Sequence, residues 1–241
     1  MAIFKDAEGP RNYRYGVIDS TGSVVVPCSY KYVNNMENGF ISINDNGKEW
    51  YVNKKGEKID ESLVPSGDYY NKYGIGIVKK NGKYGCVDGN GRLITPFIYD
   101  KIEKPSDGLL RVKSNGKYGY IDITGKEIIP VEWSNASNFS DGLAEVIKDE
   151  KVLFIDKSGK ELFRLDFEAI GVFHDGMVLV ESNGKFGYVD STGKLTVPCI
   201  YTFKSVNGWD MTNNFSEGLA CVYKNGKVGF VDKTGKSTFD Y

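Results

Sequence analysis

The chain is poor in the residues that most often carry out chemistry. Its 241 residues include one histidine and four cysteines. The cysteines form no CxxC pair, and no histidine stands at metal-ligand spacing from them; they are Cys28, Cys86, Cys199 and Cys221. We therefore predict four free thiols in a reducing compartment. The single histidine, His174, has no accompanying nucleophile motif, so nothing in the sequence indicates nucleophilic catalysis.

Long apolar runs and an excess of basic charge are also missing. No stretch approaches the ~18 apolar residues of a membrane-spanning helix, and the start, MAIFKDAEGPRNYRYG, lacks the apolar core of a signal peptide. We therefore expect a cytoplasmic protein that does not bind membranes. The 31 basic and 32 acidic residues nearly balance. Because dedicated nucleic-acid-binding proteins are usually basic, we do not expect a nucleic-acid partner.

An internal repeat dominates what is present. The phrase KSNGKYGYIDITGKEIIP at 113–130 returns as ESNGKFGYVDSTGKLTVP at 181–198 and as KKNGKYGCVDGNGRLITP at 79–96. Its acidic or amide residue recurs in steps of 34, 35, 34, 34, 34 and 42, at Asp19, Asn53, Asp88, Asp122, Asp156, Asp190 and Asp232. We predict one repeat domain over 1–241, with copies at approximately 10–43, 44–78, 79–112, 113–146, 147–180, 181–222 and 223–241. The sixth carries an insertion, 204–214; the seventh is partial, and the first is expected to lack its first strand.

Two turn signals mark each copy. Asn-Gly, the strongest short signal for a β-hairpin, occurs at 46–47, 81–82, 115–116, 183–184 and 225–226. The fifth copy has Asp149-Glu150 there, and we expect a different turn. Asp-x-x-Gly follows, as in Asp122 and Gly125, and indicates a turn in which the glycine is left-handed and the aspartate accepts backbone N–H bonds. The apolar stretches between these turns, such as 109–112 and 118–121, are too short for helices and indicate strands.

These features predict an all-β fold. Each copy would supply three or four short antiparallel strands, and seven copies would stack in an open curved or superhelical array. A closed ring resembling a β-propeller is the alternative, although propeller blades are usually longer. Recurring aromatic and apolar residues would fill the space between copies, namely Tyr30, Tyr99, Trp133, Phe167 and Tyr201 after the proline, then Met36, Phe139, Phe173 and Phe215.

The phrases NGKYGYID, NGKFGYVD and NGKVGFVD, followed by TGK, proline, an aromatic residue and FS[DE]GL, resemble the WG (KWG) repeat family of bacterial β-repeat proteins. The resemblance covers the chain from about Tyr13 to Phe239. The Trp-Gly pair stands here as 15–16, 84–85, 118–119, 186–187 and 228–229, while the second and fifth copies depart with Glu49-Trp50 and Val152-Leu153. The resemblance implies a β-repeat array with an interaction role, a bacterial or phage origin, and no defined enzymatic activity.

The recurring aspartate raises the possibility of a calcium array. Asn53, however, keeps the hydrogen-bonding oxygen of this position and loses its charge, and no second carboxylate recurs at fixed spacing. Because Ca²⁺ takes 6–8 oxygen ligands, we interpret the aspartates as turn residues and expect neither a metal nor a cofactor. Paired carboxylates for glycoside hydrolysis can come from distant segments, yet the repeat positions have structural explanations. We expect no enzymatic activity.

Lysines at the turns are candidates for partner contacts. Lysine follows Asn-Gly at Lys48, Lys83, Lys117, Lys185 and Lys227, with Lys151 at the same place; a second set follows the other turn at Lys126, Lys160, Lys194 and Lys236. Stacked copies would align each set into a row that attracts acidic partners. The alternative is that these tips are solvated and block edge pairing.

The insertion in the sixth copy is the most individual segment, with Trp209, Asp210 and Met211 in a polar context. An exposed tryptophan is typical of interface hot spots, unless Trp209 folds back onto the core. We predict a binding and scaffold protein that docks a protein partner through an extended repeat face and could regulate or inhibit it. The predicted contact residues are Trp209, Asp210, Met211, Trp50, Lys83, Lys117 and Lys185.

A multivalent binder of carbohydrate or another polymer, with equivalent sites between repeats, is the alternative function. Exposed aromatic residues at one position in every copy would favour it. The irregular second, fifth and sixth copies favour a single protein partner instead.

Overall fold

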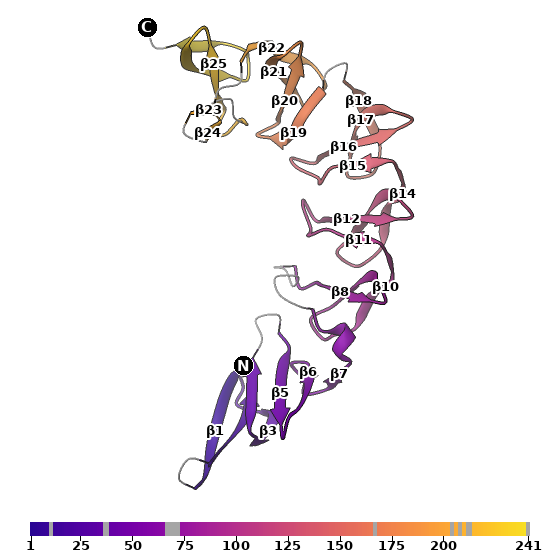
Figure 1. Cartoon of the computed structure of the whole chain (residues 1–241), viewed down its shortest axis with the longest axis vertical. Coiled ribbons are helices and arrows are strands. Elements are labelled where there is room, and N and C mark those ends of the chain that lie inside the picture. Colours follow the sequence, from indigo (N-terminus) through magenta and orange to yellow (C-terminus); the bar gives the residue numbers. More distant parts are fainter. Residues whose placement is uncertain are drawn as a thin grey trace. The chain divides into compact units, whose positions relative to one another are not determined.

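The structure, a computed structural model, describes residues 1–9, 12–35, 39–65, 73–165, 168–202, 205–206, 209–210 and 214–239. Figure 1 shows short strands joined into successive hairpins. A single 3-10 turn, η1 (Glu61–Leu63), is the one helical element in this part of the chain. The prediction of an all-β fold built from antiparallel hairpin repeats is confirmed. The openness of the array and its description as one domain stay predictions.

No helix within the described ranges has the length and the apolar character that crossing a membrane requires.

The strands fall into two compact units, each described here by itself. Unit 1 comprises residues 1–104 and 123–125. Its sheets have the strand orders β1-β2-β3, β4-β5-β6-β7 and β10-β9-β8. The strands are β1 (Ala2–Gly9), β2 (Asn12–Ile18), β3 (Val24–Tyr30), β4 (Tyr32–Asn35), β5 (Ile41–Asp45), β6 (Lys48–Val52), β7 (Lys58–Ile59), β8 (Gly76–Lys80), β9 (Lys83–Val87), β10 (Leu93–Tyr99) and β11 (Lys101–Ile102).

Unit 2 comprises residues 105–122 and 126–241. It contains β12-β13-β14, two four-stranded sheets, the pair β23-β24, and β25-β26-β27. The strands are β12 (Leu109–Ser114), β13 (Lys117–Asp122), β14 (Glu127–Trp133), β15 (Asn135–Ala136), β16 (Leu143–Lys148), β17 (Lys151–Asp156), β18 (Glu161–Arg164), β19 (Glu168–His174), β20 (Met177–Ser182), β21 (Lys185–Asp190), β22 (Leu195–Tyr201), β23 (Ser205–Val206), β24 (Trp209–Asp210), β25 (Leu219–Lys224), β26 (Lys227–Asp232) and β27 (Ser237–Phe239).

The hairpin turns follow the Asn-Gly prediction, with one correction. Asn115 and Gly116 have φ of 49° and 78°, which is the positive pair that a type I′ turn requires. Asp149 and Glu150 also have positive φ, 50° and 62°, and Lys148 pairs with Lys151 as Ser114 pairs with Lys117. The expectation of a different turn in the fifth copy was wrong. The register of the flanking strands imposes the same turn on residues that disfavour it.

The Asp-x-x-Gly turns are built as predicted. In the sixth copy, the Oδ1 atom of Asp190 accepts hydrogen bonds from the backbone N–H groups of Thr192 and Lys194 at 2.9 and 3.1 Å. The N–H of Gly193 donates to the Asp190 carbonyl at 3.0 Å, and the φ of Gly193 is 86°. Asn53 does the same with its amide oxygen, which accepts from Lys55 at 2.9 Å. The side-chain oxygen, and not its charge, is therefore what the turn requires.

The glycine of the Trp-Gly position lies where two strands approach closely. A Cβ atom on Gly119 would stand 2.7 Å from the carbonyl oxygen of Ile129, and one on Gly187 would stand 2.4 Å from that of Val197. Both distances are shorter than real Cβ contacts, and the obstacle is backbone that cannot rotate away. The glycine is thus required by the close approach of the next strand.

Neighbouring sheets of unit 2 pack through a repeated contact. We call the side of each unit 2 hairpin that carries Tyr120, Phe154, Tyr188 or Phe230 its front face. The knob segments are the tetrapeptides 139–142, 173–176 and 215–218, each beginning with phenylalanine and ending with glycine. The Phe139, Phe173 and Phe215 rings meet the rings of the preceding front faces edge-on, at centroid distances of 4.7, 5.4 and 4.8 Å. Their prediction as fillers between copies is confirmed.

Polar bonds hold each knob segment in register. The Ser106 hydroxyl donates to the Phe139 carbonyl at 2.6 Å, and Ser140 donates in the same way to Phe173. The carboxylate oxygen Oδ2 of Asp107 accepts from the Gly142 N–H at 2.8 Å. The equivalent bonds of Asp141 to Gly176 and of Asp175 to Gly218 measure 2.8 and 2.6 Å. These bonds link residues 33 to 43 positions apart, so they fix how successive sheets stack.

The remaining interlayer residues agree in part with the prediction. Tyr99, Trp133 and Tyr201 are buried, whereas Tyr30 is half-buried. Met36 and Phe167 lie outside the described residues. The segment between the aromatic residue and the knob segment, whose conformation the sequence left open, forms two-residue strands such as β15.

The first copy differs from the prediction. It does not lack its first strand, because β1 pairs with β2 over most of its length, with Ala2 opposite Ile18 and Lys5 opposite Tyr15. The sequence of β1 carries neither an Asn-Gly turn nor the other repeat signals, so its place in the repeat was not visible.

Candidate protein-docking site

The Asn-Gly turns place the predicted lysines at one end of each hairpin. Lys117 and Lys185 are the first residues of β13 and β21 and are exposed. Lys83 opens β9 and is half-buried, because its Nζ atom lies 2.5 Å from the Oδ1 atom of Asp100. Lys117 and Lys185 are thus available to a partner, whereas Lys83 is held by a carboxylate of its own unit.

Aromatic residues lie directly beside these lysines. Tyr84 and Tyr118 follow Lys83 and Lys117 by one residue and are half-buried. The Nζ atoms of Lys79 and Lys113 lie 4.9 and 4.8 Å from the centres of these two rings, close enough for a cation–π interaction. We call the set formed in a copy by the turn lysine, the following aromatic residue and the lysine opposite it the turn-tip group.

The lysines opposite the rings were missed by the sequence analysis. Lys79 pairs with Tyr84, and Lys113 pairs with Tyr118, across the hairpin. Each lysine stands two residues before Asn-Gly and each tyrosine two residues after it. Since a two-residue turn places such positions opposite each other on one face, this symmetric spacing was the signal that could have found them. A further pair joins Lys148 to the Trp133 ring at 5.3 Å.

Trp50, a predicted contact residue, has a structural role as well. It is half-buried in β6, and its ring meets that of Tyr30 edge-on at 5.4 Å. Trp50 packs against a core cluster of unit 1 that includes Val17, Val26 and Ile43. Its prediction as a partner contact stays a prediction, and part of its surface is already used within unit 1.

The insertion of the sixth copy is described in part. Ser205–Val206 and Trp209–Asp210 form the short antiparallel pair β23-β24, in which Val206 stands opposite Trp209. The side chains of Trp209 and Asp210 and the whole of Met211 lie outside the described residues. Their roles as contact residues stay predictions.

The recurring aspartates are already occupied by the turns. Asp156 accepts from the Ser158 hydroxyl at 2.6 Å and from two backbone N–H groups, and the Ser158 hydrogen bond is the largest of the effects that lower the pKa of Asp156. Within the described parts of the chain, no cluster of three or more His, Cys, Asp or Glu residues could hold a metal ion. The four cysteines are free thiols. Cys28 and Cys199 are half-buried and not fully buried, and burial raises the pKa of Cys86 to about 11.

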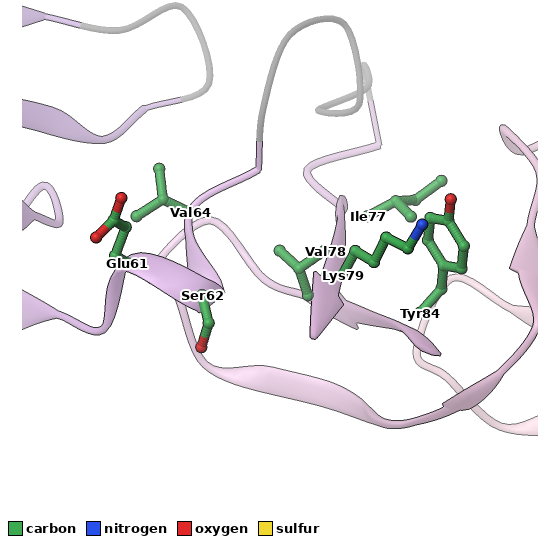
Figure 2. A pocket seen from close by; sticks show the side chains of 7 residues that line it. All are labelled: Glu61, Ser62, Val64, Ile77, Val78, Lys79 and Tyr84. Atoms are coloured by element: carbon green, nitrogen blue, oxygen red, sulfur yellow. The ribbon is translucent and has the colours of Figure 1, made fainter. Parts of the chain in front are cut away.

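One pocket of about 250 Å³ lies in unit 1 between η1 and β8. Figure 2 shows Lys79 and Tyr84 together on one side of it and Glu61, Ser62 and Val64 on the other. The pocket is small for a drug-sized ligand, and its cation is the one that lies over Tyr84. It adds a concave edge to the turn-tip group of the third copy.

The recurring hairpins define a β-repeat protein, a class of fold that generally mediates binding. The sequence model of the WG containing repeat matches residues 15–48, 84–118, 118–151, 154–186 and 186–227. These segments make up well over half of the chain, and the chain belongs to the WG repeat family. The resemblance drawn from the Asn-Gly and Asp-x-x-Gly phrases is thereby confirmed.

Solved structures give more distant likenesses. Hsv2p of Kluyveromyces lactis aligns with a TM-score of 0.44 and 9% identity over 97% of this chain and 93% of its own. PorZ is a surface component of the type-IX secretion system of Porphyromonas gingivalis. It aligns with a TM-score of 0.35 and 12% identity over 98% of this chain and 35% of its own. A eukaryotic initiation factor aligns with a TM-score of 0.41 and 11% identity over 95% of this chain and 70% of its own. No curated protein sequence matches the chain. At these TM-scores, the likenesses support no conclusion about function.

Proposed function

We propose that the chain is a non-enzymatic binding protein that docks a protein partner through the turn-tip groups of its repeats. The observation that carries this proposal is a lysine, a half-buried aromatic ring and a second lysine at the same end of the hairpins of the third and fourth copies. The sixth copy repeats the first two with Lys185 and Phe186, but Glu181 stands opposite the ring. Docking at this surface would regulate or inhibit the partner. We place this activity in the cytoplasm.

The chemistry of the turn-tip group favours an acidic protein surface. Lys117 and Lys185 present exposed ammonium groups, which attract carboxylates and steer association. The ring of Tyr118 offers apolar area that is already ordered by the strand, so little side-chain entropy is lost on binding. Because dissolved salt screens the attraction between exposed charges, the association should weaken as salt is added.

The strands supply the rigidity that such a surface needs. Tyr118 stands opposite Trp133 in the neighbouring strand, and both pack on the core between the first two sheets of unit 2. A residue held by strand pairing on both sides changes position little when a partner binds. The turn-tip group is thus preorganised, which favours rigid complementarity over folding on binding.

A multivalent carbohydrate binder is the second candidate. Half-buried tyrosines at the Trp-Gly position, Tyr15, Tyr84 and Tyr118, favour it, since sugars stack on aromatic rings. Val152 and Val228 stand at this position in two other copies, and cations already lie over two of the three rings. These departures favour a protein partner, which needs no equivalent site in every copy.

The test uses two charge-reversed variants with the same net charge. The first carries Lys117→Glu, Lys151→Glu and Lys185→Glu, at the lysines that follow the two-residue hairpin turns. The control carries Lys126→Glu, Lys160→Glu and Lys194→Glu at the opposite turns of the same three copies. Wild type and both variants would be used to capture proteins from a lysate of the source organism, and the captured protein would then be purified and titrated.

We expect the first variant to bind the purified partner at least tenfold more weakly and the control to bind within threefold of wild type. Equal loss in both variants would show that net charge alone matters and would contradict a defined surface.

A third variant, Trp209→Ala with Met211→Ala, tests the insertion. If only this variant loses the partner, the site lies in the insertion. Capture of glycans without protein on a printed array would support the carbohydrate alternative.

A further inference from the structure

The front face of the last sheet differs from those before it. Tyr120, Phe154 and Tyr188 are exposed by 1% or less, whereas Phe230 at the equivalent position is 51% exposed. Leu219, on the same face, is 48% exposed, and its equivalents Leu109, Leu143 and Met177 are all buried. The sequence of the face is that of a covered surface, but nothing in the described chain covers it.

The three earlier front faces show what such a surface binds. Each holds one knob segment. The phenylalanine ring of the segment meets the aromatic ring of the face, as Phe139 meets Tyr120. In the first two, a serine hydroxyl of the face donates to the carbonyl of that phenylalanine. In all three, an aspartate of the face accepts from the N–H of the last glycine.

The last sheet presents all three of these groups. Phe230 supplies the ring, Ser216 the hydroxyl and Glu217 the carboxylate. The φ of Glu217 is 53°, as in Asp175, and those of Asp107 and Asp141 are 50° and 51°, so each carboxylate leaves the backbone at the same kind of turn. The structure gives no hydrogen bond to the Ser216 hydroxyl or to the Glu217 carboxylate within the described residues.

We propose that the front face of β25-β26-β27 is a docking site for a loop of the Phe-Ser-Asp-Gly type that lies outside residues 1–241. The ring of the loop would lie edge-on to Phe230 and beside Leu219. Its phenylalanine carbonyl would accept from Ser216, and its glycine N–H would donate to Glu217. The site continues the series of contacts that already exists three times within unit 2.

A second copy of this chain does not offer such a loop. Its segments 139–142, 173–176 and 215–218 are already docked on the preceding front faces. The equivalent positions of unit 1 read Met-Glu-Asn-Gly at 36–39 and Asn-Lys-Tyr-Gly at 71–74. The occupant is therefore a loop that lies outside residues 1–241. The site is separate from the turn-tip groups, and it does not depend on the function proposed for them.

The probe is a synthetic peptide with the sequence of residues 134–148, SNASNFSDGLAEVIK, which contains a knob segment and its two flanking strands. It would be titrated into the full chain while the NMR signals of Leu219 and Phe230 are followed. We expect saturable shifts at these two residues. A peptide in which the phenylalanine is replaced by alanine should bind at least tenfold more weakly.

Protein variants complete the test. Phe230→Ser should weaken peptide binding at least tenfold, and Glu217→Gln should weaken it about threefold. Ile98→Ser, at an apolar residue that is also 51% exposed, should leave binding unchanged. The absence of saturable shifts, or equal binding of the alanine peptide, would overturn the proposal. So would self-association of the chain that Phe230→Ser abolishes, because a second copy would then be the occupant.

Discussion

The sheets β15-β16-β17-β18 and β25-β26-β27 are built from the same hairpin but stand in different surroundings. Both pair their first two long strands in the same register, from Leu143 opposite Asp156 and from Leu219 opposite Asp232. Phe154 in the first is buried under Phe173, whereas Phe230 in the second is half exposed. The comparison teaches that the stability of a copy resides as much in the copy that follows as in its own residues.

The largest difference should appear on truncating the two phenylalanines. Phe154→Ala removes a buried ring and leaves a cavity that its neighbours cannot fill, so we expect a loss of about 3–5 kcal/mol in the free energy of unfolding. Phe230→Ala removes an exposed ring and should cost less than about 1 kcal/mol. Urea denaturation of both variants measures the two changes in the free energy of unfolding. Equal losses would mean that Phe230 is covered in solution.

The next difference concerns the carboxylates that hold the knob segments. Asp141 accepts from the Gly176 N–H at 2.8 Å, whereas Glu217 has no such donor in the described structure. Asp141→Ala should therefore lower the free energy of unfolding by about 1 kcal/mol more than Glu217→Ala. Alanine at a positive φ is strained in both variants, so this cost largely cancels. Thermal denaturation of the two variants measures both losses of stability. A larger loss for Glu217→Ala than for Asp141→Ala would contradict the prediction.

The hairpin turn is a feature in which the sheet of the buried Phe154 is less favourable than the sheet of the exposed Phe230. Glu150 holds a φ of 62°, whereas Gly226 occupies the same place at 85°. Because a side chain disfavours the left-handed region, Glu150→Gly should raise the free energy of unfolding by about 1 kcal/mol. Gly226→Glu should lower it by a similar amount. Calorimetric melting curves give both values, and destabilisation by Glu150→Gly would show that Glu150 makes a contact that outweighs its strain.

The smallest difference is expected at the Asp-x-x-Gly turns. Hydrogen bonds, first those from the Ser158 and Thr234 side chains, lower the pKa values of Asp156 and Asp232 below the ordinary 3.8. Each turn is thus stabilised above pH 3.8 and loses that contribution as the pH falls through the lower folded pKa. The protection factors of the Lys160 and Lys236 amides, which correct the measured exchange for its intrinsic dependence on pH, should fall together on acidification.

The turn of the second copy provides the control. Asn53 has no charge to lose in this range, and its amide oxygen accepts from the Glu57 N–H at 3.0 Å. The protection factor of the Glu57 amide should not follow the acid transition of the other two turns. A fall at Glu57 over the same pH range would show that the sheets open as a whole, and that the aspartates do not report on their own turns.

The parts of the fold that the sequence predicted are those with a local cause. Asn-Gly determines its turn through two backbone conformations, and Asp-x-x-Gly determines its turn through one side chain. Both act within five residues and so can be seen in the sequence. The turn at Asp149-Glu150 and the strand β1 were predicted wrongly because strand pairing imposed them, and neither carries the local signal of its counterparts.

The contacts between sheets could be predicted only in part. The recurring phenylalanines indicated that something fills the space between copies, since no other role suits an apolar residue at a fixed period. The bonds of Asp107 and Ser106 to the next copy could not be found in this way, because Ser-Asp-Gly also describes an ordinary solvated turn. For the candidate site, the turn lysines were found at Lys117 and Lys185. The lysines that lie over the rings were missed, although their symmetric spacing about Asn-Gly could have indicated the pairing that the structure shows.

The knob segment 139–142 faces in two directions at once. Phe139 and Gly142 are received by Ser106 and Asp107, while Ser140 and Asp141 receive the next segment. Each repeat thus acts as plug on one side and socket on the other, with the same polarity throughout unit 2. A duplication or deletion of one whole repeat would rejoin matching plugs and sockets. Such a protein can gain or lose repeats during evolution while every contact between neighbouring repeats stays of the existing kind.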